Sequence, residues 1–481
     1  MARVDVPTKT RDDSDRDLSR ATKLHPALVL VWARAVPERV GEALVVERTG
    51  RPHVFGRGAA QDGDELPRLS LVRQRPGRND PTPPLEDPFL SRAQLLIERQ
   101  PDGLVVENRG KRPLVTADGE ADGPVRVEPG DLLEVKGELC FLCCARPKAL
   151  ASLRTPRKEL HAFGQADEQG LVGESPAAWA LRDQIAFIAA RSAHVLLLGE
   201  SGTGKEIVAQ AIHARSSRGG RRIVSRNAAT LPAGIADAEL FGNIANYPNA
   251  GTPERAGLIG EADGSTLFLD EIGELPEELQ TRLLRVLDDG GEYQRLGDAK
   301  RRSSNLRLIG ATNRPASALR NDVAARLRLR LTLPTLGERA EDVPLIAAHL
   351  LRRIAKRDPD AVAPFLRDGT PAMSCELVRA LVQRRYAGGV REVEAVLWAS
   401  IATSPDDCLE LTDAARASVD EGERGPAVGR VHPQDLTEAD VRAALDRVGG
   451  VQERAWRELG LANRYVLKRL VKKLGLKDVK E

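Results

Sequence analysis

The sequence predicts a multidomain protein with an N-terminal β-sandwich, a central α/β P-loop domain carrying a helical lid, and a small all-α C-terminal segment. Three observations lead to this fold class. Short β-like segments separated by frequent turn residues occupy 27–144, which is typical of a sandwich. After residue 170, apolar strands alternate with helical patterns, which predicts a parallel sheet with helices packed on it. From about 338 to 405, and again over 434–481, the pattern is helical throughout.

The boundaries between these parts follow changes in composition. Residues 1–24 are charged and poor in apolar side chains, which predicts a disordered tail. The polar stretches 148–169 and 406–433 are expected to be linkers. The remaining boundaries are 25–147 for the sandwich, 170–405 for the α/β domain with its lid from about 338, and 434–481 for the C-terminal helices.

The overall composition excludes some classes of protein. Lys and Arg number 72 against 70 Asp and Glu, a net charge of +2, so any binding to nucleic acid requires a local basic patch. The apolar fraction of 41% is sufficient for packed cores. The longest apolar runs, such as 27–33, are far shorter than the roughly 18 residues that span a bilayer, and the N-terminus has no apolar signal region. We therefore expect a cytoplasmic protein with no membrane partner.

Three of the five cysteines are clustered in the segment CFLCC. A metal or redox site there would need a second cysteine pair or a nearby His pair, and the sequence has neither. In a strand, Cys140 and Cys144 would share one face and Cys143 would take the other. The segment is therefore interpreted as a buried strand.

The strongest motif is HVLLLGESGTGKE at 194–206, an apolar strand followed by a glycine-rich loop and a helical pattern. In such a loop the backbone N–H groups face phosphate oxygens, and the lysine adds a charge for the β and γ phosphates. The alternative is an ordinary glycine-rich strand–helix turn. The residues expected to bind nucleotide are Gly199, Glu200, Ser201, Gly202, Thr203, Gly204, Lys205 and Glu206, the last replacing the Ser or Thr that usually ligates magnesium.

A second strand, TLFLDE at 266–271, ends in two carboxylates. Asp270 is expected to hold Mg²⁺, directly or through water, and Glu271 to orient and activate the attacking water. A third strand ends at Thr312 and Asn313, which could contact the γ-phosphate or the water. A surface acidic pair and a polar strand cap are the structural alternatives. Together, the phosphate loop and these strand ends favour an ATPase site that binds ATP and Mg²⁺, and this is the leading interpretation of the α/β domain.

The C-terminal segment combines an apolar helix face with basic residues. Thr437 and Asp440 resemble a capping box that opens a first helix, and Asn463 is a suitable N-cap for a third. Arg464 and Tyr465 are candidates for base or phosphate contacts. This layout predicts a helix-turn-helix that binds DNA, against the alternative of a solvated basic helix. The third helix has an apolar face of Leu467, Leu470, Val471 and Leu474, and the basic residues Lys468, Arg469, Lys472 and Lys473, of which the lysines are expected to contact the DNA backbone.

The motifs of the central part occur together in one known family. Because of these motifs, residues 171–405 resemble the bacterial enhancer-binding proteins, the AAA+ activators of sigma-54 RNA polymerase. The basic C-terminal helices resemble the Fis-type DNA-binding module of the same family. Glu206 is that family's usual residue at the end of the loop. The matching segments are GESGTGKE (199–206), AELFG (238–242), LFLDEIGELP (267–276), RLIGATNRP (307–315) and ERAEDVPLI (338–346).

The resemblance implies roles for four further residues. Asn227 falls where the family holds the catalytic Glu until ATP is sensed. Arg320 and Arg326 fall where the family has arginine fingers that act on a neighbouring subunit's ATP, which implies a hexameric ring. Arg391 matches the sensor arginine of the lid, although the usual WPGN before it reads YAGG at 386–389.

One departure concerns the loop that contacts sigma-54 in this family. The usual GAFTGA motif reads Asn-Tyr-Pro-Asn-Ala-Gly at 246–251, so the Phe and Thr positions hold Pro248 and Asn249. A proline changes the loop backbone, and the apolar and hydroxyl contacts are lost. The resemblance therefore implies an ATP site without implying the sigma-54 contact.

The N-terminal part resembles the forkhead-associated domains, β-sandwiches that bind phosphothreonine. Arg57 and Arg92 would supply charge and Ser91 a hydroxyl to the phosphate, and Asn108 would fix the peptide backbone. The family's SRxH motif ends here in Gln94. A sandwich used only for protein docking is the alternative. The resemblance rests on HVFGRG (53–58), LEDPFLSRAQLLIE (85–98) and VVENRG (105–110).

These inferences combine into an ATP-dependent, DNA-binding transcriptional regulator controlled by a phosphothreonine-containing protein. Three hypotheses remain open at this point. The protein opens sigma-54 promoters, or it uses ATP only to set its assembly on DNA without engaging sigma-54, or it is a phosphopeptide-binding scaffold with an inactive nucleotide site. Intact Lys205, Asp270 and Glu271 argue against the third.

Overall fold

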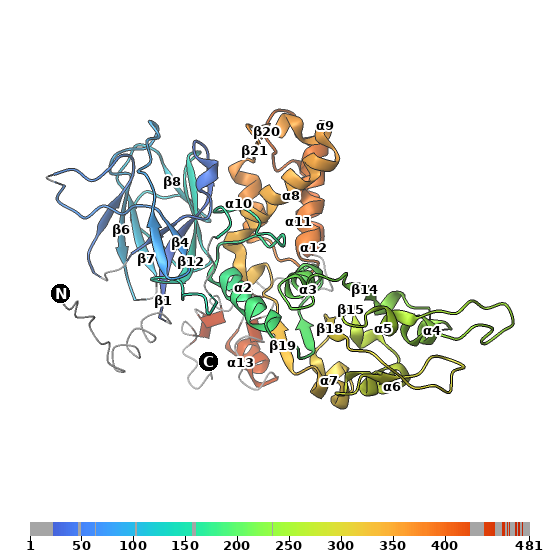
Figure 1. The fold of residues 1–481 in the computed structure, drawn as a ribbon. Coiled ribbons are helices and arrows are strands. Elements are labelled where there is room, and N and C mark those ends of the chain that lie inside the picture. The colour runs from blue at the N-terminus through green and yellow to red at the C-terminus, as the bar shows by residue number, and fades with distance from the viewer. Residues whose placement is uncertain are drawn as a thin grey trace, which may run out of the picture.

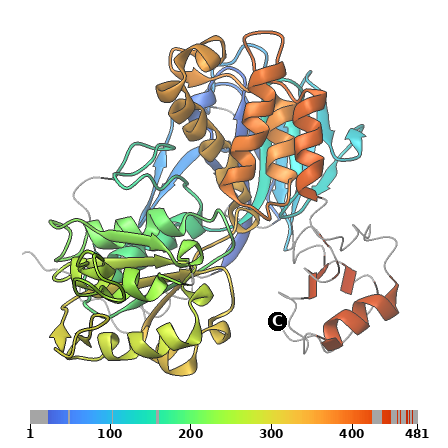
Figure 2. The ribbon, with the colours of Figure 1, turned by 90° about the vertical axis from the view of Figure 1, so that its right-hand side faces the viewer.

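The computed structural model describes an N-terminal β domain, an α/β domain, a helical lid and part of a C-terminal helical segment (Figures 1 and 2). In Figure 1 the lid, drawn in orange, stands beside the blue β domain, and the green and yellow α/β domain extends below it and away from the β domain. None of the described helices is long and apolar enough to cross a bilayer. The described residues are 23–46, 50–62, 64–101, 103–155, 160–232, 234–423, 437–447, 455–456, 459, 461, 467–468, 470–471 and 474.

The β domain is built from two antiparallel sheets that share one apolar core. Leu30 and Leu44 of the larger sheet and Ile97 and Val106 of the smaller sheet are fully buried in this core. The larger sheet has the order β5-β4-β2-β1-β12-β11-β8-β9 and the smaller β10-β7-β6-β3. The strands are β1 (Leu24–Ala33), β2 (Ala43–Val45), β3 (His53–Phe55), β4 (Val72–Arg75), β5 (Arg78–Pro81), β6 (Leu95–Arg99), β7 (Leu104–Asn108), β8 (Leu114–Thr116), β9 (Gly119–Glu120), β10 (Val125–Val127), β11 (Leu132–Val135) and β12 (Leu139–Pro147).

The clustered cysteines lie on β12 as the alternation predicts. Cys143 packs into the core between the two sheets, whereas Cys140 and Cys144 lie on the opposite face of the strand. All three are free thiols and buried. The interpretation of this segment as a buried strand is confirmed.

The α/β domain contains a five-stranded parallel sheet in the order β14-β15-β18-β13-β19. Its registers pair Leu198 with Thr312 and Asn227 with Asp270, so the carboxyl ends of these strands lie at one edge of the sheet. In parallel α/β sheets that edge is where ligands bind. The elements are α2 (Pro176–Ala189), β13 (Val195–Leu198), α3 (Lys205–Ala214), β14 (Val224–Asn227), α4 (Ala236–Phe241), α5 (Gly257–Glu261), β15 (Thr266–Asp270), α6 (Glu277–Leu287), β16 (Glu292–Tyr293), β17 (Arg302–Ser303), β18 (Arg307–Thr312), α7 (Asn321–Arg326) and β19 (Leu329–Thr332).

The lid is helical, with one small hairpin that the sequence pattern did not predict. Its helices share a core that includes Leu350, Leu381 and Leu397. The segment 406–433, expected as a linker, contains a helix, because Ala415 and Val419 supply an apolar face to the same core. The elements are α8 (Val343–Arg357), α9 (Pro359–Val362), β20 (Leu366–Arg367), β21 (Thr370–Pro371), α10 (Cys375–Gln383), α11 (Val390–Thr403) and α12 (Asp413–Glu423).

The other expected linker, 148–169, is packed against the α/β domain over its described C-terminal part. Asp167 is 6% exposed and accepts hydrogen bonds from the N–H groups of Gln169 and Leu171. Its carboxylate also pairs with the buried guanidinium of Arg182 on α2 at 3.1 Å. Some polar residues of this segment are therefore buried and bonded to the α/β domain, whereas the linker prediction expected all of them to face solvent.

The described C-terminal residues contain one complete helix and an apolar cluster. Helix α13 (Glu438–Arg447) begins after Thr437, whose N–H and hydroxyl bond to Asp440, so the predicted capping box is confirmed. Leu467, Leu470 and Val471 are buried against residues of α13, as expected for the apolar face of the third helical pattern.

Candidate active site

The phosphate loop connects β13 to α3 and is shaped by glycines. Gly202 and Gly204 have φ of +70° and +94°, a region that non-glycine residues rarely adopt. Gly204 is also the N-cap of α3, so the N–H groups of the first helical turn point toward the loop. Thr203 Oγ1 donates to the carbonyl of Glu200 at 2.8 Å, which closes the loop.

Lys205 is 7% exposed and lies within this loop. Its Nζ donates to the carbonyls of Gly199 and Glu200 at 3.0 and 3.2 Å. The same Nζ lies 3.9 Å from Glu271 Oε1, a long ion pair across the sheet edge. The lysine is thus positioned where phosphate oxygens would replace two carbonyl partners.

Glu271 follows the last residue of β15 and has φ +49°. This backbone directs its carboxylate toward the neighbouring strand end, where Oε2 accepts the N–H of Asn313 at 3.2 Å. A non-glycine residue in this region is strained by about 1–3 kcal/mol and is frequent at functional sites. Lys205, Glu271 and Asn313, predicted from three separate motifs, therefore lie together at the sheet edge.

Asp270 provides a suitable oxygen ligand for Mg²⁺. Its Oδ1 accepts the N–H of Glu271 at 3.0 Å, and no described residue donates to its other oxygen. Within the described residues there is no group of three or more His, Cys, Asp or Glu side chains that could hold a metal ion. This donor set fits Mg²⁺, which usually binds to one or two carboxylates together with substrate phosphates.

The lid contacts the phosphate loop directly. The N–H of Val390 donates to the carbonyl of Gly202 at 3.0 Å. A Cβ on Gly202 would lie 2.0 Å from the carbonyl oxygen of Gly388, so the two backbones are in contact. Gly388 is common to WPGN and to the YAGG of 386–389, and the replacement adds one glycine, Gly389, which also lies against Gly202.

The residues assigned by resemblance lie in less specific surroundings. Asn227, at the end of β14, uses its Oδ1 to cap the N–H of Ala229 at 2.9 Å. Arg320 pairs with Asp322, and this ion pair raises the pKa of Arg320. Arg326 pairs with Asp288 at 2.6 Å.

Both of these arginines precede or lie on α7 and are accessible to solvent. Arg391 is exposed in the first turn of α11. Arg320 and Arg326 are thus bonded to carboxylates of the same chain while their guanidinium groups remain partly exposed.

The segment that replaces GAFTGA forms an exposed loop closed at its base by Asn243. The side-chain N–H groups of Asn243 donate to the carbonyls of Ile244, Tyr247 and Pro253 at 2.9, 3.4 and 2.9 Å. Residues 245–251 are all exposed, and the Tyr247–Pro248 peptide is cis.

This loop is paired with the segment that joins β16 and β17. The N–H of Ile244 donates to the carbonyl of Leu296 at 3.1 Å, and Tyr247 packs against Gly297. Figure 1 shows the two segments projecting side by side from the α/β domain. Residues 246–251 therefore form a projecting loop that is anchored to the β16–β17 segment at its base.

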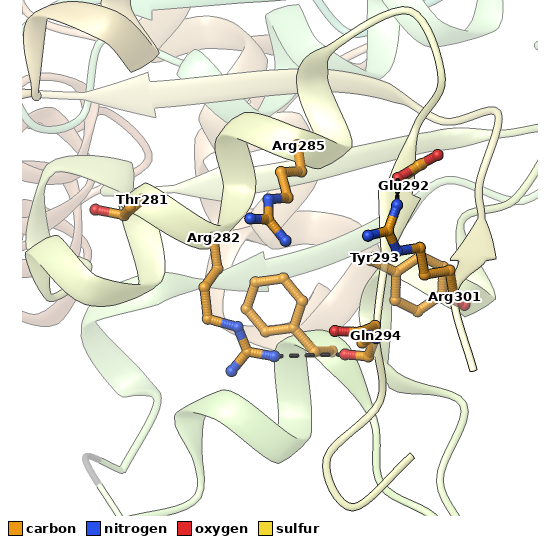
Figure 3. Close-up of a pocket in the computed structure, with 8 residues that line it drawn as sticks. Thr281, Arg282, Arg285, Glu292, Tyr293, Gln294 and Arg301 are labelled. Carbon is orange, nitrogen blue, oxygen red and sulfur yellow. Dashed lines mark hydrogen bonds and ion pairs between the residues drawn. The ribbon is translucent and has the colours of Figure 1, made fainter. Parts of the chain in front are cut away.

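A pocket of about 240 Å³ lies at the base of these two segments (Figure 3). Arg282 is held there by an ion pair with Asp237 and stacks over the ring of Phe241 at 4.0 Å. None of the predicted ATP-site residues lines this pocket, so it is separate from the phosphate loop. Its lining residues are Phe241, Thr281, Arg282, Arg285, Glu292, Tyr293, Gln294 and Arg301.

In the β domain, the two loops that carry the predicted phosphate ligands lie next to each other. The N–H of Arg57 donates to the carbonyl of Ser91 at 3.0 Å. Ser91 Oγ accepts the N–H of Lys111 at 3.2 Å, which leaves its hydroxyl proton free to donate. Arg92 is exposed and reaches the carbonyl of Ala59 at 3.4 Å.

Gln94 is a structural residue whose role the sequence did not predict. It is fully buried, and its Oε1 accepts the N–H of Ser91 at 3.1 Å while its Nε2 donates to Asn108 Oδ1 at 2.8 Å and to the carbonyl of Arg112 at 3.2 Å. Asn108 Nδ2 also donates to the carbonyl of Arg112. The amide of Asn108 is therefore used within the domain, and Gln94 braces the Ser91 loop where the resembling family has histidine.

The residues predicted to contact DNA belong to the C-terminal segment, which the structure describes in part. Lys468 lies among the described residues, on the segment whose neighbours Leu467 and Leu470 are buried. Asn463, Arg464, Tyr465, Arg469, Lys472 and Lys473 lie outside the described residues.

Comparison with known proteins adds independent evidence. Residues 171–335 match the family described as Sigma-54 interaction domain. The transcriptional regulatory protein ZraR of Salmonella typhimurium is 35% identical over 331 residues, which cover 67% of this chain and 73% of ZraR.

The chain belongs to the family of bacterial enhancer-binding proteins, the sigma-54-dependent transcriptional regulators.

The chain is also similar to a second transcriptional activator and to one solved structure. The formate hydrogenlyase transcriptional activator FhlA of Escherichia coli is 36% identical over 317 residues, or 64% of this chain and 44% of FhlA. A crystal structure of NtrX from Brucella abortus in complex with ADP is similar with a TM-score of 0.47 and 29% identity, over 64% of this chain and 70% of that chain. The match of residues 171–335 to the sigma-54 interaction domain makes the central domain of this enhancer-binding protein one of the AAA+ ATPase type.

Proposed function

We propose that this protein is an ATP-hydrolysing, DNA-binding regulator of transcription whose β domain senses phosphothreonine. The proposal rests above all on the convergence of Lys205, Glu271 and Asn313 at the carboxyl edge of the parallel sheet. The steady-state rate of ATP hydrolysis, measured for the wild type and for Glu271→Gln, tests it.

The geometry supports a specific division of labour. Lys205 exchanges its two carbonyl partners for β and γ phosphate oxygens, and the loop N–H groups surround the same phosphates. Glu271, held by the N–H of Asn313, orients the attacking water and accepts its proton. Mg²⁺ bound through Asp270 would neutralise charge on the phosphate oxygens. Arg320 or Arg326 of a neighbouring copy would stabilise the transition state, which requires a ring.

Two hypotheses remain for how ATP hydrolysis is used: the protein acts on sigma-54 polymerase, or it does not. Membership of the family favours promoter opening. The exposed loop 246–251 favours the alternative, in which ATP only sets assembly on DNA, because proline and asparagine replace the apolar and hydroxyl groups of the usual motif.

Open-complex formation with purified sigma-54 polymerase, with and without ATP, separates these answers. ATP-dependent opening supports the first. If the protein hydrolyses ATP and assembles on DNA in an ATP-dependent way but opens no promoter, the second hypothesis is supported. A matched variant in which residues 246–251 are changed to Gly-Ala-Phe-Thr-Gly-Ala would gain opening activity if the loop alone is limiting.

The sensing role of the β domain has a separate test. Arg57, Ser91, Arg92 and Lys111 come from adjacent loops, and Ser91 retains a free hydroxyl proton. Titration with phosphothreonine and unmodified peptides should show preference for the phosphorylated form and a loss of that preference in Arg57→Ala. Arg78→Ala, which changes an exposed arginine of the β4–β5 hairpin, is the matched control. Equal affinity for the two peptides would remove the sensing role.

A further inference from the structure

The amino edge of the five-stranded sheet, at the opposite end of the strands from the candidate active site, is rich in arginine. Arg218, Arg221 and Arg222 belong to the connection between α3 and β14, Arg307 begins β18, and Arg328 immediately precedes β19. The strands of this sheet are parallel, so the residues that precede or begin them lie along one edge. These five residues are called the arginine edge below.

Neutral oxygens, and not carboxylates, hold these side chains. Arg218 donates to the carbonyl of Ser265 at 3.1 Å and to the side-chain oxygen of Asn305 at 2.7 Å. Arg221 donates to the carbonyl of Asp263 at 3.1 Å. The carboxylate of Asp263 accepts the N–H of Asn305 at 2.7 Å and attracts Arg218 from beyond ion-pair distance. The guanidinium groups are therefore positioned by hydrogen bonds that do not neutralise their charge.

The positive charge of the arginine edge is local and uncompensated. Arg326, two residues before Arg328, pairs with Asp288 at 2.6 Å, whereas no described carboxylate forms an ion pair with a residue of the arginine edge. The chain as a whole has a net charge of only +2. A protein of such balanced charge binds a polyanion through a local patch of this kind.

One member of the arginine edge is buried without a counter-ion. Arg307 is 1% exposed and donates to the carbonyls of Ala193 and Ile188 at 3.2 and 2.8 Å. Its Nη1 is buried and has no hydrogen-bond partner among the described residues. Burial and the nearby charge of Arg218 lower the pKa of Arg307 to about 10, so the side chain stays protonated at neutral pH. A buried cation without a paired anion is costly, and an anion bound at this edge would reduce that cost.

The dimensions of the arginine edge match those of a phosphate backbone. Neighbouring strands lie about 4.8 Å apart, so the five strand starts extend over about 19 Å. Arg222 lies beside the first of these strand starts and Arg328 beside the last, and both are exposed. One strand of duplex DNA carries a phosphate about every 3.4 Å of helix axis, so the edge can lie along about five or six phosphates. Guanidinium groups bind phosphate oxygens through pairs of parallel N–H bonds.

We propose that the arginine edge is a second DNA-binding surface, which contacts the phosphate backbone of the duplex that the C-terminal helices also bind. This inference rests on the proposed DNA-binding function and extends it to the α/β domain. DNA and nucleotide can be bound at the same time, because they occupy opposite ends of the strands. Contacts to the backbone carry no base sequence, so this surface increases affinity without adding specificity.

The test is binding of the full chain to a mixed-sequence DNA duplex of about 40 base pairs over a series of salt concentrations. The variant Arg221→Gln/Arg222→Gln removes two charges and keeps an N–H group for the carbonyl of Asp263. Each lost phosphate contact lowers the slope of log K against log salt by about 0.9, so the double variant should lower the slope by about 1.8. If the electrostatic contribution vanishes near about 1 M salt, the affinity at about 0.15 M should fall about 30-fold.

Two controls accompany this measurement. Arg78→Gln/Arg367→Gln removes the same charge from exposed arginines that pair with Asp80 and Asp407, and it should leave the slope unchanged. Lys468→Gln, on the C-terminal segment, tests the proposed DNA-binding function separately and should lower the slope by about 0.9. ATP turnover without DNA should be the same in Arg221→Gln/Arg222→Gln and the wild type, which shows that the variant is folded.

The outcomes separate the two proposals. An unchanged slope in Arg221→Gln/Arg222→Gln, with a decrease in Lys468→Gln, overturns the arginine edge and leaves DNA binding by the C-terminal helices standing. A decrease in the double variant alone supports the arginine edge and removes Lys468 from the predicted contacts. If the wild type does not bind the duplex, the proposed DNA-binding function fails and the arginine edge fails with it. A single-stranded RNA of the same length is measured in parallel, and loss of RNA binding alone in the double variant would assign the surface to RNA and overturn the proposal.

Discussion

The contact between the lid and the phosphate loop allows a sharp test, because a single methyl group should disrupt it. Gly389 has φ +63° and ψ −138°, a combination that only glycine adopts readily. A Cβ there would lie 2.5 Å from the carbonyl carbon and oxygen of Gly202 and 2.8 Å from the carbonyl oxygen of Ser201. These are backbone atoms of the phosphate loop, which cannot move aside without displacing the loop.

The magnitude follows from two contributions. The backbone conformation of Gly389 costs a residue with a Cβ about 1–3 kcal/mol. Displacing packed backbone costs about 1–3 kcal/mol more, as for other overpacked sites. Gly389→Ala should therefore cost about 2–6 kcal/mol in total. If only about 1.4 kcal/mol of this falls on the ATP-bound transition state, turnover decreases tenfold.

The assay pairs Gly389→Ala with Gly369→Ala in the same lid. Gly369, in the turn between β20 and β21, also has a positive φ of +76°, but a Cβ there meets nothing within 4 Å. Gly369→Ala should lower the thermal midpoint slightly and leave ATP turnover unchanged. Gly389→Ala should lower the thermal midpoint and the ATP turnover more than Gly369→Ala does. Equal effects of the two substitutions on turnover would refute the contact between the lid and the phosphate loop.

Two more predictions concern buried polar groups. Arg182→Met should destabilise the chain to denaturant by up to about 3–5 kcal/mol, because it leaves the buried Asp167 carboxylate with only the longer 3.7 Å pair to Arg215. Burial alone raises the pKa of Asp167, but Arg182 and two backbone N–H groups outweigh it and lower that pKa. Stability from this pair should therefore be complete above about pH 4 and decrease as the pH falls through the lowered pKa, and a pH series of thermal unfolding should show a larger loss in the wild type than in Arg182→Met. Gln94→Leu should cost about 1–3 kcal/mol and weaken phosphopeptide binding, whereas Gln94→His, if its ring reaches Asn108, should retain binding; equal loss in both would contradict the bracing role.

Much of the fold could be predicted from the sequence because its signals are local. Strand and helix periods around Val195–Leu198, Lys205–Ala214 and Thr266–Asp270 agree with the structure, and so does the alternation of Cys140, Cys143 and Cys144 between two faces. The phosphate loop and the two carboxylates were predictable for the same reason. Each of these motifs consists of a few consecutive residues whose types indicate their chemistry.

What the sequence did not reveal depends on contacts between distant segments. Arg379 and Glu134 are 245 residues apart, so nothing in either neighbourhood indicates an interdomain pair. Gln94 is a similar case, since its role depends on Asn108 and Arg112 reaching it from another loop. Segments 148–169 and 406–433 were predicted to be linkers because they are polar or weakly apolar. Their buried residues are covered by partners far away in the sequence, such as Arg182 for Asp167 and the lid core for Ala415.

The central claim is that Glu271 activates water for cleavage of ATP bound at the Lys205 loop. The most direct measurement is the ATP turnover of Glu271→Gln against the wild type, with nucleotide binding measured on the same samples. The amide keeps an oxygen for the N–H of Asn313, so binding should be retained while turnover falls by about 100-fold or more. Wild-type turnover in Glu271→Gln, or a wild type that binds ATP and never cleaves it, would contradict the account.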